Sequence, residues 1–204
     1  MSLPSGNDPR PAEPVAGTTS LPVSGKRELR NDLIRARLAI DGGLRAKWDA
    51  RIGKHILECL QARPVASLGV YWPIRNEPDL HELYAKLLAQ GVLLALPLVV
   101  EKDSPLEFAA WKPGDALVEE SFGIKVPVNR TRVALPEALL APCVGFNSAR
   151  YRLGYGGGFF DRTLATTPRP LSLGVAYSCL ETNFAVEEYD IPLDCIVTES
   201  AILR

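Results

Sequence analysis

A glycine-rich segment, residues 152–162, limits the fold of this chain more than any other part of the sequence. Four of the 16 glycines lie in it, beside Arg152, Asp161 and Arg162. Glycine adopts positive φ angles without strain and lets successive backbone N–H groups point toward one centre, which makes a nest for oxyanions. The next residues, 159–165, have the pattern of a helix, and anions bind where helices begin. The segment therefore predicts a phosphate-binding loop between a strand and a helix.

An acidic residue beside this loop points to a metal ion. Asp161 falls in the first turn of the expected helix, toward the mouth of the loop. A carboxylate and a phosphate repel each other unless a cation lies between them, and Mg²⁺ prefers the oxygens of both groups. We therefore expect Mg²⁺ at Asp161. The alternative is a glycine-rich turn without a ligand, because glycine also separates strands from helices in ordinary turns.

Several common kinds of site do not fit the sequence. A P-loop would need Gly-x-x-x-x-Gly-Lys-Ser/Thr, and a dinucleotide fingerprint would need glycine where Phe159 stands. The two histidines, His55 and His81, leave little room for a Ser-His-Asp relay or a His-rich metal site. The four cysteines lie far apart without a Cys-x-x-Cys pair, which argues against zinc and indicates reduced thiols.

Length and composition predict one domain. The chain has 204 residues, 47% of them hydrophobic and 23% charged. Its formal net charge of −1 gives no general attraction to nucleic acid or to an anionic membrane. No apolar run approaches the roughly 18 residues of a membrane span, and the first residues lack the pattern of a signal peptide. We expect a cytoplasmic protein with a disordered, proline-rich leader over residues 1–24 and a single domain over residues 25–204.

The hydrophobic pattern alternates between helices and strands. Helices are expected over residues 26–40, 44–62 and 78–90, strands over 66–72, 92–98, 139–146, 171–177 and 195–199, a hairpin or edge strand over 106–111, and mostly loop over 114–132. This alternation predicts the α/β fold class, with three layers in which helices flank a mostly parallel sheet. The glycine loop then lies at the carboxyl edge of the sheet, where such folds bind ligands.

The first expected helix carries a narrow basic face. Lys26, Arg30 and Arg37 fall within about 40° of one another at 100° per residue. This face is either a cationic wall of the phosphate site or an ordinary solvated helix surface.

In these features the chain resembles the 5-formyltetrahydrofolate cyclo-ligase family, whose members are also called methenyltetrahydrofolate synthetases. The family hallmark is an Arg-Leu-Gly-x-Gly-x-Gly-Tyr-Tyr-Asp segment, here residues 152–161, and the resemblance runs from Lys26 to Ser200. It implies a ligase that uses ATP and Mg²⁺ to convert 5-formyltetrahydrofolate into 5,10-methenyltetrahydrofolate, releasing ADP and phosphate. It also implies a small-molecule substrate and no nucleic-acid or membrane partner, and we expect a monomer.

The resemblance further implies roles for individual residues. ATP would be held by Lys26, Arg30, Arg152, Leu153, Gly154, Tyr155, Gly156, Gly157, Gly158, Phe159 and Phe160, and Arg152 and Lys26 would also be catalytic. The folate would be bound by Trp72, Glu77, Tyr155, Gly156, Gly157, Gly158 and Phe159. Mg²⁺ would be held by Asp161 and Asp190. Ordinary roles remain open for three of these residues: Glu77 as an exposed loop acid, Trp72 as core, and Asp190 as a turn residue.

Departures from the hallmark keep alternatives open. Phe159 and Phe160 replace the paired tyrosines, and Gly157 stands where some members have a lysine, whose charge Lys125 could supply instead. One alternative is a non-catalytic protein that binds a folate or a phosphorylated metabolite. Another is a relative of sugar-phosphate isomerases or CoA-transferases, which would need no ATP.

Overall fold

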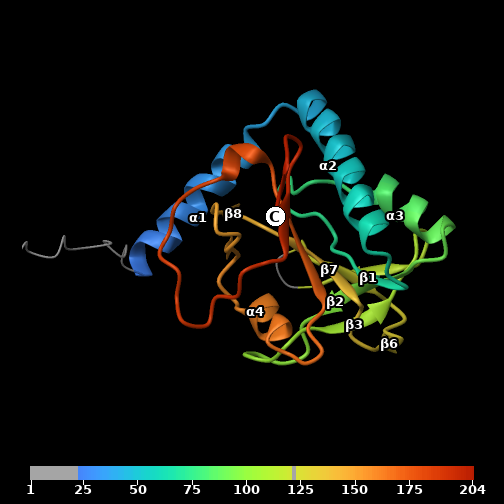
Figure 1. Cartoon of the computed structure of the whole chain (residues 1–204). Coiled ribbons are helices and arrows are strands. Elements are labelled where there is room, and N and C mark those ends of the chain that lie inside the picture. The colour runs from blue at the N-terminus through green and yellow to red at the C-terminus, as the bar shows by residue number, and fades with distance from the viewer. Residues whose placement is uncertain (1–22, 121–122) are drawn as a thin grey trace, which may run out of the picture.

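The centre of the molecule is a sheet of eight strands in the order β12-β11-β10-β7-β1-β2-β3-β6 (Figure 1). The computed structural model describes residues 23–120 and 123–204. The run from β11 to β2 is parallel, and β12, β3 and β6 at the two edges are antiparallel. The α/β class and the mostly parallel sheet expected from the sequence are confirmed.

The elements follow one another in a βαβ-like order. The helices are α1 (Val23–Leu38), α2 (Gly42–Ala62), α3 (His81–Ala89), α4 (Phe159–Leu164) and the 3-10 helix η2 (Ser178–Leu180). The main sheet contains β1 (Ser67–Gly69), β2 (Leu93–Leu98), β3 (Glu107–Ala110), β6 (Arg132–Val133), β7 (Ala138–Pro142), β10 (Leu171–Val175), β11 (Cys195–Val197) and β12 (Ile202–Leu203). Two small sheets pair β4 (Leu117–Glu119) with β5 (Lys125–Pro127) and β8 (Gly145–Phe146) with β9 (Arg152–Leu153).

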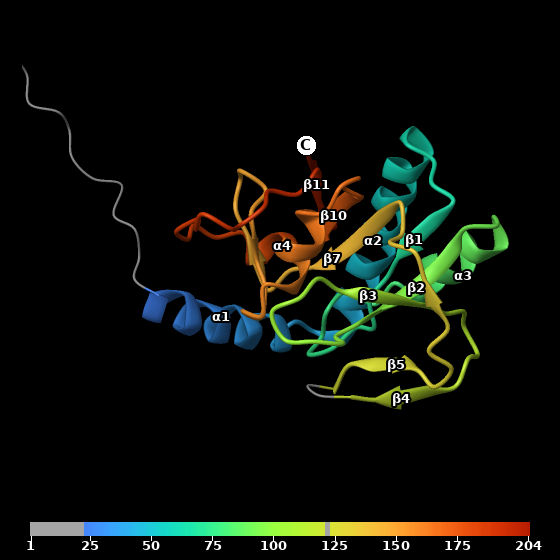
Figure 2. The ribbon, with the colours of Figure 1, turned by 90° about the horizontal axis from the view of Figure 1, so that it is seen from below.

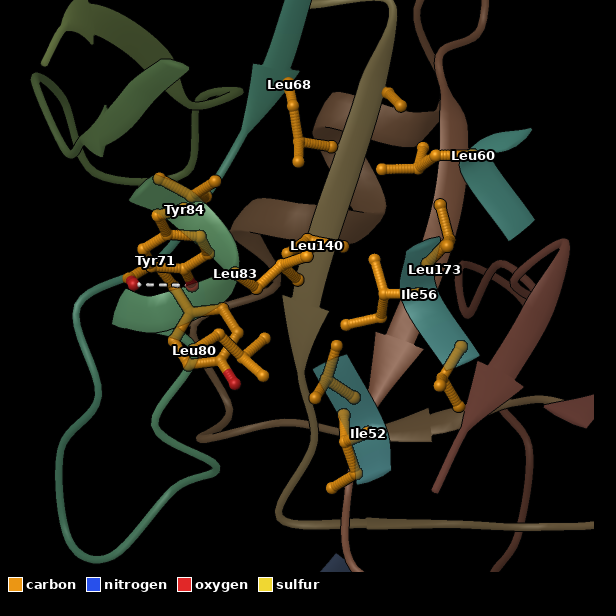
Figure 3. Packing of buried hydrophobic residues seen from close by; sticks show 14 of the residues in the cluster. Ile52, Ile56, Leu60, Leu68, Tyr71, Leu80, Leu83, Tyr84, Leu140 and Leu173 are labelled. Atoms are coloured by element: carbon orange, nitrogen blue, oxygen red, sulfur yellow. Dashed lines mark hydrogen bonds between the residues drawn. The ribbon is translucent and has the colours of Figure 1, made fainter. Parts of the chain in front are cut away.

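Helices cover both faces of the sheet and make three layers. In Figure 1, α1, α2 and α3 lie on one side of the sheet and α4 lies on the other. Strand β7 has buried side chains on both faces of the sheet. Ala138 and Leu140 belong to the core beneath α2 and α3, while Leu139 and Ala141 belong to the core beneath α4. Figure 3 shows the first core, where Leu140 lies close to the helical residues around it. A strand buried on both faces is apolar throughout, which is why the central strands are continuous hydrophobic runs in the sequence.

The start of α2 follows from a local signal. The Asp41 carboxylate accepts a hydrogen bond from the Leu44 N–H at 2.9 Å and so caps α2, which begins two residues before the expected position 44. Helix α1 begins at Val23, inside the segment expected as a disordered leader. Residues 1–22 of that leader lie outside the described residues.

Two segments differ from the sequence-based expectation. Within residues 114–132, expected to be mostly loop, β4 and β5 form a hairpin beside β3 (Figure 2), since strands of three residues are too short to show a period. The expected strand 139–146 is divided, because the chain leaves the main sheet after Pro142 and the Val144 N–H then donates to the Leu153 carbonyl at 2.9 Å. The single apolar run therefore serves two sheets.

The sheet has a topological switch point between β1 and β7. In the sheet β1 is followed on one side by β2, and β7 is followed on the other side by β10. The chain therefore leaves β1 and β7 in opposite directions across the sheet. Open α/β sheets bind ligands at such a switch point, at the carboxyl ends of the strands. The Glu77 loop follows β1, and the glycine loop follows β7 after the β8–β9 hairpin. In residues 23–120 and 123–204, no helix combines the length and apolar character needed to cross a bilayer.

Candidate functional site at the β1–β7 switch point

A fully buried arginine, Arg37 of α1, lies at the switch point. Its Nε donates to the carbonyl of Arg75 at 2.9 Å, and its Nη1 donates to the carbonyl of Cys143 at 3.2 Å. Those carbonyls belong to the loop after β1 and to the linker after β7. Its Nη2 donates to the hydroxyl of Tyr155 at 2.7 Å, in the glycine loop. Arg37 therefore connects three segments with α1, and the solvated-face alternative for this residue is wrong.

Glu77 is buried behind Tyr155. Its side chain has only 2% exposure; the Tyr155 hydroxyl donates to Oε1 at 2.7 Å and the Ile74 N–H donates to Oε2 at 3.0 Å. Burial raises the pKa of Glu77, while Arg37, whose Nη2 lies 3.9 Å from Oε1, opposes the rise. The alternative that Glu77 is an exposed loop acid is therefore wrong. In this conformation both carboxylate oxygens already accept a hydrogen bond.

The glycine loop has the backbone conformation that its composition predicts. Gly156 and Gly158 have φ angles of 99° and 65°, which side chains other than glycine rarely adopt. Arg30 of α1 donates from Nε to the Gly154 carbonyl at 2.8 Å, and this contact leaves both its Nη groups beside Gly156. Helix α4 has only six residues, so the helix start contributes little of the positive field. Attraction for an anion comes from the loop and the neighbouring arginines.

Arg152 and Asp161 pair at the base of the loop. The Arg152 Nη2 donates to the Asp161 Oδ2 at 3.2 Å, and the guanidinium lies 4.9 Å from the ring centroid of Phe160. The Nε of Arg152 is buried without a hydrogen-bond partner. A phosphate oxygen could accept a hydrogen bond from this donor and so provide its missing partner.

Lys26 and Asp190 form the outer end of the site. The Lys26 Nζ lies 2.8 Å from Glu187 Oε1 and 3.2 Å from Asp190 Oδ2. The Ile191 N–H donates to Asp161 Oδ1 at 3.4 Å, so the two expected Mg²⁺ ligands stand on contacting segments. Among the described residues, no cluster of three or more His, Cys, Asp and Glu side chains could hold a metal unaided. Two carboxylates still fit Mg²⁺, which usually completes its coordination with phosphate oxygens and water.

A cationic hollow of about 560 Å³ opens between α1 and the glycine loop. Arg27, Arg30 and Arg75 line it together with Asn31, Ile34, Tyr155 and Gly156, and no carboxylate is among the lining residues. The Arg75 guanidinium lies 5.5 Å from the ring centroid of Tyr155. The hollow is therefore suited to a polyanion. A second hollow, of about 760 Å³, includes Trp111 and Pro127 in its lining but none of the expected site residues.

Trp72 lies in an aromatic cluster with His81 and Trp111. Its ring centroid is 4.5 Å from that of His81 and 6.2 Å from that of Trp111. Lys125 Nζ lies 5.0 Å from the Trp72 ring centroid, so this lysine is held by the cluster. The structure brings together the other expected site residues, on α1, the Glu77 loop, the glycine loop and the Asp190 segment, but places Trp72 beside them on a separate wall.

Sequence reasoning missed the contribution of two residues. Arg75 has a positive φ angle of 49°, followed by Asn76 at 58°, and this tight turn aims its side chain at Tyr155. Tyr155 was expected to contact ATP and the folate, but the sequence did not show that its hydroxyl joins Arg37 to Glu77. The burial of Arg37 could have been inferred from its position beside the apolar stripe of its helix. For the contacts of Arg75 and Tyr155 the sequence contains no local signal.

Comparison with known proteins agrees with this arrangement. A model of the 5-formyltetrahydrofolate cyclo-ligase family matches residues 22–199. The chain is 33% identical over 144 residues to the 5-formyltetrahydrofolate cyclo-ligase of Escherichia coli K12, covering 67% of this chain and 79% of the relative. It is 26% identical over 176 residues to that of Mycoplasma pneumoniae, covering 85% and 98%.

Solved structures show the same fold. The 5,10-methenyltetrahydrofolate synthetase of Mycoplasma pneumoniae superposes with a TM-score of 0.71 at 24% identity, covering 85% of this chain and 98% of the other. That of Aquifex aeolicus superposes with a TM-score of 0.69 at 30% identity, covering 88% and 92%. In both cases the shared region includes nearly all of the solved chain.

Proposed function

Because the chain belongs to the 5-formyltetrahydrofolate cyclo-ligase family, a family of ligases, we propose that it cyclises 5-formyltetrahydrofolate to 5,10-methenyltetrahydrofolate at the expense of ATP, with Mg²⁺. The observation that carries this proposal is the gathering of three bases around the glycine loop. Arg30 donates to the Gly154 carbonyl, Arg152 pairs with Asp161 at the base of the loop, and Lys26 pairs with Asp190 on a segment that contacts Asp161. They come from two segments more than 120 positions apart. Such a concentration of positive charge suits a triphosphate.

The reaction needs an activated formyl oxygen. The N5-formyl oxygen is a weak nucleophile; it accepts the γ-phosphoryl group of ATP, N10 then attacks the activated carbon, and phosphate leaves as the new ring closes. In phosphoryl transfer, positioning and charge neutralisation do most of the catalytic work. This chain supplies both through Lys26, Arg152 and the backbone N–H groups of the glycine loop.

The nucleotide side of the site is built from α1 and the glycine loop. We assign ATP to Lys26, Arg30 and the loop residues Arg152, Leu153, Gly154, Tyr155, Gly156, Gly157, Gly158, Phe159 and Phe160. Arg30 is fixed by its bond to the Gly154 carbonyl, and its free Nη groups face the hollow. Arg27 and Arg75 extend the same positive surface.

Asp161 and Asp190 are the residues that would hold Mg²⁺. When bound there, the ion neutralises charge on the phosphate oxygens and orients them. Each carboxylate now pairs with a base, Asp161 with Arg152 and Asp190 with Lys26. With Mg²⁺ held there, Arg152 would be free to donate to a phosphate oxygen, whereas Lys26 would also have to leave Glu187, 2.8 Å from its Nζ.

The folate side is built around Glu77. The N–H edge of a pterin donates hydrogen bonds, and a buried carboxylate is a strong acceptor for them. Tyr155 and Phe159 supply aromatic surface for the ring, while Gly156, Gly157 and Gly158 allow close approach. Trp72 would contact the folate from the separate aromatic cluster that it forms with His81 and Trp111. Tyr155 now occupies one acceptor position of Glu77, so the pterin reaches the carboxylate by displacing or sharing that hydroxyl.

We further propose a monomeric, cytoplasmic enzyme whose partner is this small molecule, and two features suit the compartment and the absence of other partners. All four cysteines are free, which suits a reducing compartment. The net charge of −1 offers no general attraction to nucleic acid or an anionic membrane.

The alternative is folate or phosphometabolite binding without turnover, and Gly157 and Phe160 are the positions that favour it. A spectrophotometric assay separates the two. Purified protein is mixed with 5-formyltetrahydrofolate, ATP and Mg²⁺, each omitted in turn, and absorbance of the methenyl product is followed. A rise that requires all three establishes the ligase. Folate binding without any rise establishes the binding protein.

A further inference from the structure

Arg37 is the most deeply buried of the described lysines and arginines, and neither the glycine hallmark nor the proposed chemistry gives it a role. Burying a guanidinium is costly unless its donors are satisfied and a negative charge lies near. Here three donors are satisfied at 2.7–3.2 Å, and Glu77 lies 3.9 Å away. The fold therefore keeps a charged pair where an apolar side chain would fill the same space.

The hydrogen bonds around Arg37 have a fixed direction. A guanidinium only donates and a carboxylate only accepts. The Tyr155 hydroxyl must therefore accept from Arg37 and donate to Glu77, over 2.7 Å in both steps. The array Arg37–Tyr155–Glu77 has one orientation. A planar fork with three separate partners also permits little rotation of the guanidinium.

This array joins the two sides of the proposed site. Helix α1 carries Lys26 and Arg30 on the nucleotide side, and the loop after β1 carries Glu77 on the folate side. Arg37 belongs to the first of these segments and binds the second through the Arg75 carbonyl. Its bond to the Cys143 carbonyl anchors both to the end of β7. The relative position of the two sides thus depends on one guanidinium.

We propose that Arg37 is a positioning residue, which fixes the Glu77 carboxylate relative to the phosphate-binding face of α1 and the glycine loop without touching either substrate. This inference rests on the proposed function, because it takes Glu77 as the folate acceptor. Arg37 acts on the folate through Glu77 alone.

The array also sets the protonation of Glu77. Burial raises the pKa of this carboxyl, and Arg37, the Ile74 N–H, the Tyr155 hydroxyl and Arg75 all lower it. The other ionisable groups that face it are buried and neutral: Tyr71 after β1, Tyr84 of α3 and Cys143. Removing Arg37 therefore raises the pKa of Glu77 further, and a smaller fraction of the accepting carboxylate form remains at a given pH.

The test compares Arg37→Met and Arg37→Lys with Arg35→Met and Arg35→Lys. Arg35 lies on the same helix with a side chain that is 78% exposed and paired with Asp32 on the surface, so it controls for changes in α1 itself. Dissociation constants for 5-formyltetrahydrofolate and for ATP are measured separately by titration calorimetry, between about pH 5.5 and 8.5. Thermal unfolding is followed in parallel.

Arg37→Met is expected to raise the Kd for the folate about 10–100-fold, the effect of losing a charged hydrogen-bonded partner. The Kd for ATP changes less than about threefold, because Arg30 keeps its own anchor at Gly154. The pH below which the folate no longer binds moves upward. Arg37→Lys is expected to show the pH dependence of folate binding that wild type shows, because the ammonium keeps the positive charge. Its affinity for the folate is expected to stay below that of wild type, because lysine lacks the planar set of donors of a guanidinium. The Arg35 variants behave as wild type.

Equal losses of folate and ATP affinity without a pH shift would show a merely structural role, and unchanged affinities would show none; either overturns the proposal. Should Arg37→Met fail to fold, Arg37→Lys carries the test, because its Kd for the folate must rise while its Kd for ATP stays near that of wild type. Equal changes in the two constants, or no change in either, would overturn the proposal. A wild-type protein that binds both ligands without forming methenyl product would refute the ligase but leave this test intact. Wild type that binds no folate removes both.

Discussion

The Lys26 ammonium donates to the Asp190 carboxylate over 3.2 Å, although 164 positions separate the two residues. Lys26 is the expected phosphate ligand and Asp190 an expected metal ligand, so the structure pairs two groups that would bind opposite charges. Their side chains are 7% and 24% exposed. Glu187 Oε1 lies closer still to the ammonium, at 2.8 Å. Under the proposed function, a bound phosphate would replace these carboxylates as the partner of Lys26, and a cation would replace Lys26 at Asp190.

Lys26→Met is expected to raise the KM for ATP about 10–100-fold while the KM for the folate changes little. The reason is the loss of a charged hydrogen bond to phosphate on one side of the site only. Steady-state kinetics with each substrate varied in turn checks this. Lys54→Met, at an exposed position of α2, is the matched control. A parallel rise in both KM values would contradict the assignment.

Asp161→Asn is expected to lower kcat by at least about 100-fold and to leave the fold largely intact. An amide keeps the shape but binds Mg²⁺ poorly, and it still accepts from Arg152. The measurement is turnover against Mg²⁺ concentration, together with thermal unfolding. Asp32→Asn, at an exposed position, serves as control. Full activity in Asp161→Asn would remove the metal assignment.

Stability is expected to depend on Glu77 with a definite sign. In the unfolded chain this carboxyl titrates near about 4.3, and burial raises its pKa in the folded protein. Between the two values the folded state binds more protons, so the free energy of unfolding falls as pH rises and becomes constant above the folded pKa. Urea unfolding of wild type and Glu77→Gln at several pH values should show this fall in wild type only. An identical pH dependence in both proteins would show that the carboxyl titrates normally.

Only one thiol should react in the native protein. Cys179 is exposed, whereas Cys59, Cys143 and Cys195 are buried, and burial raises the pKa of Cys143 to about 12. A thiolate is the reactive species, so iodoacetamide at mildly alkaline pH should label Cys179 alone. Mass spectrometry is expected to find one adduct on wild type, none on Cys179→Ser, and four on the unfolded wild-type chain. A second native adduct would mean that a core segment opens.

Lys125→Ala tests whether this lysine replaces the charge missing at Gly157. Lys125 Nζ lies over the Trp72 ring at 5.0 Å, on the separate aromatic wall. We therefore expect ATP affinity within about twofold of wild type and a loss of about 0.5–1 kcal/mol in unfolding free energy from the cation–π contact. Calorimetric titration and urea unfolding measure the two. A large loss of ATP affinity would restore Lys125 as a phosphate ligand.

The sequence alone determined the fold class and the identity of the loop. Mainly apolar runs at residues 92–98 and 171–177, each short and bounded by turn residues, are typical of strands buried on both faces, which favours helices on both sides of a sheet. Gly156 and Gly158 adopt positive φ angles that other residues rarely adopt, so the conformation of the loop can also be predicted from its own residues. Both signals arise from neighbouring residues, and such signals survive without tertiary structure.

Tertiary structure alone decided which charges meet. On a helical projection Arg37 differs little from Lys26 and Arg30, yet it is buried between the ends of β1 and β7, because that is where the parallel strands diverge. Tyr155 and Glu77 carry no local sign of their contact, since 78 positions separate them. The short β4–β5 hairpin was also missed, because strands of three residues are stabilised by their contacts with each other and with their neighbours, which neither segment shows by itself. Periodicity is a property of one segment, whereas a buried ion pair exists only when the whole chain has folded around it.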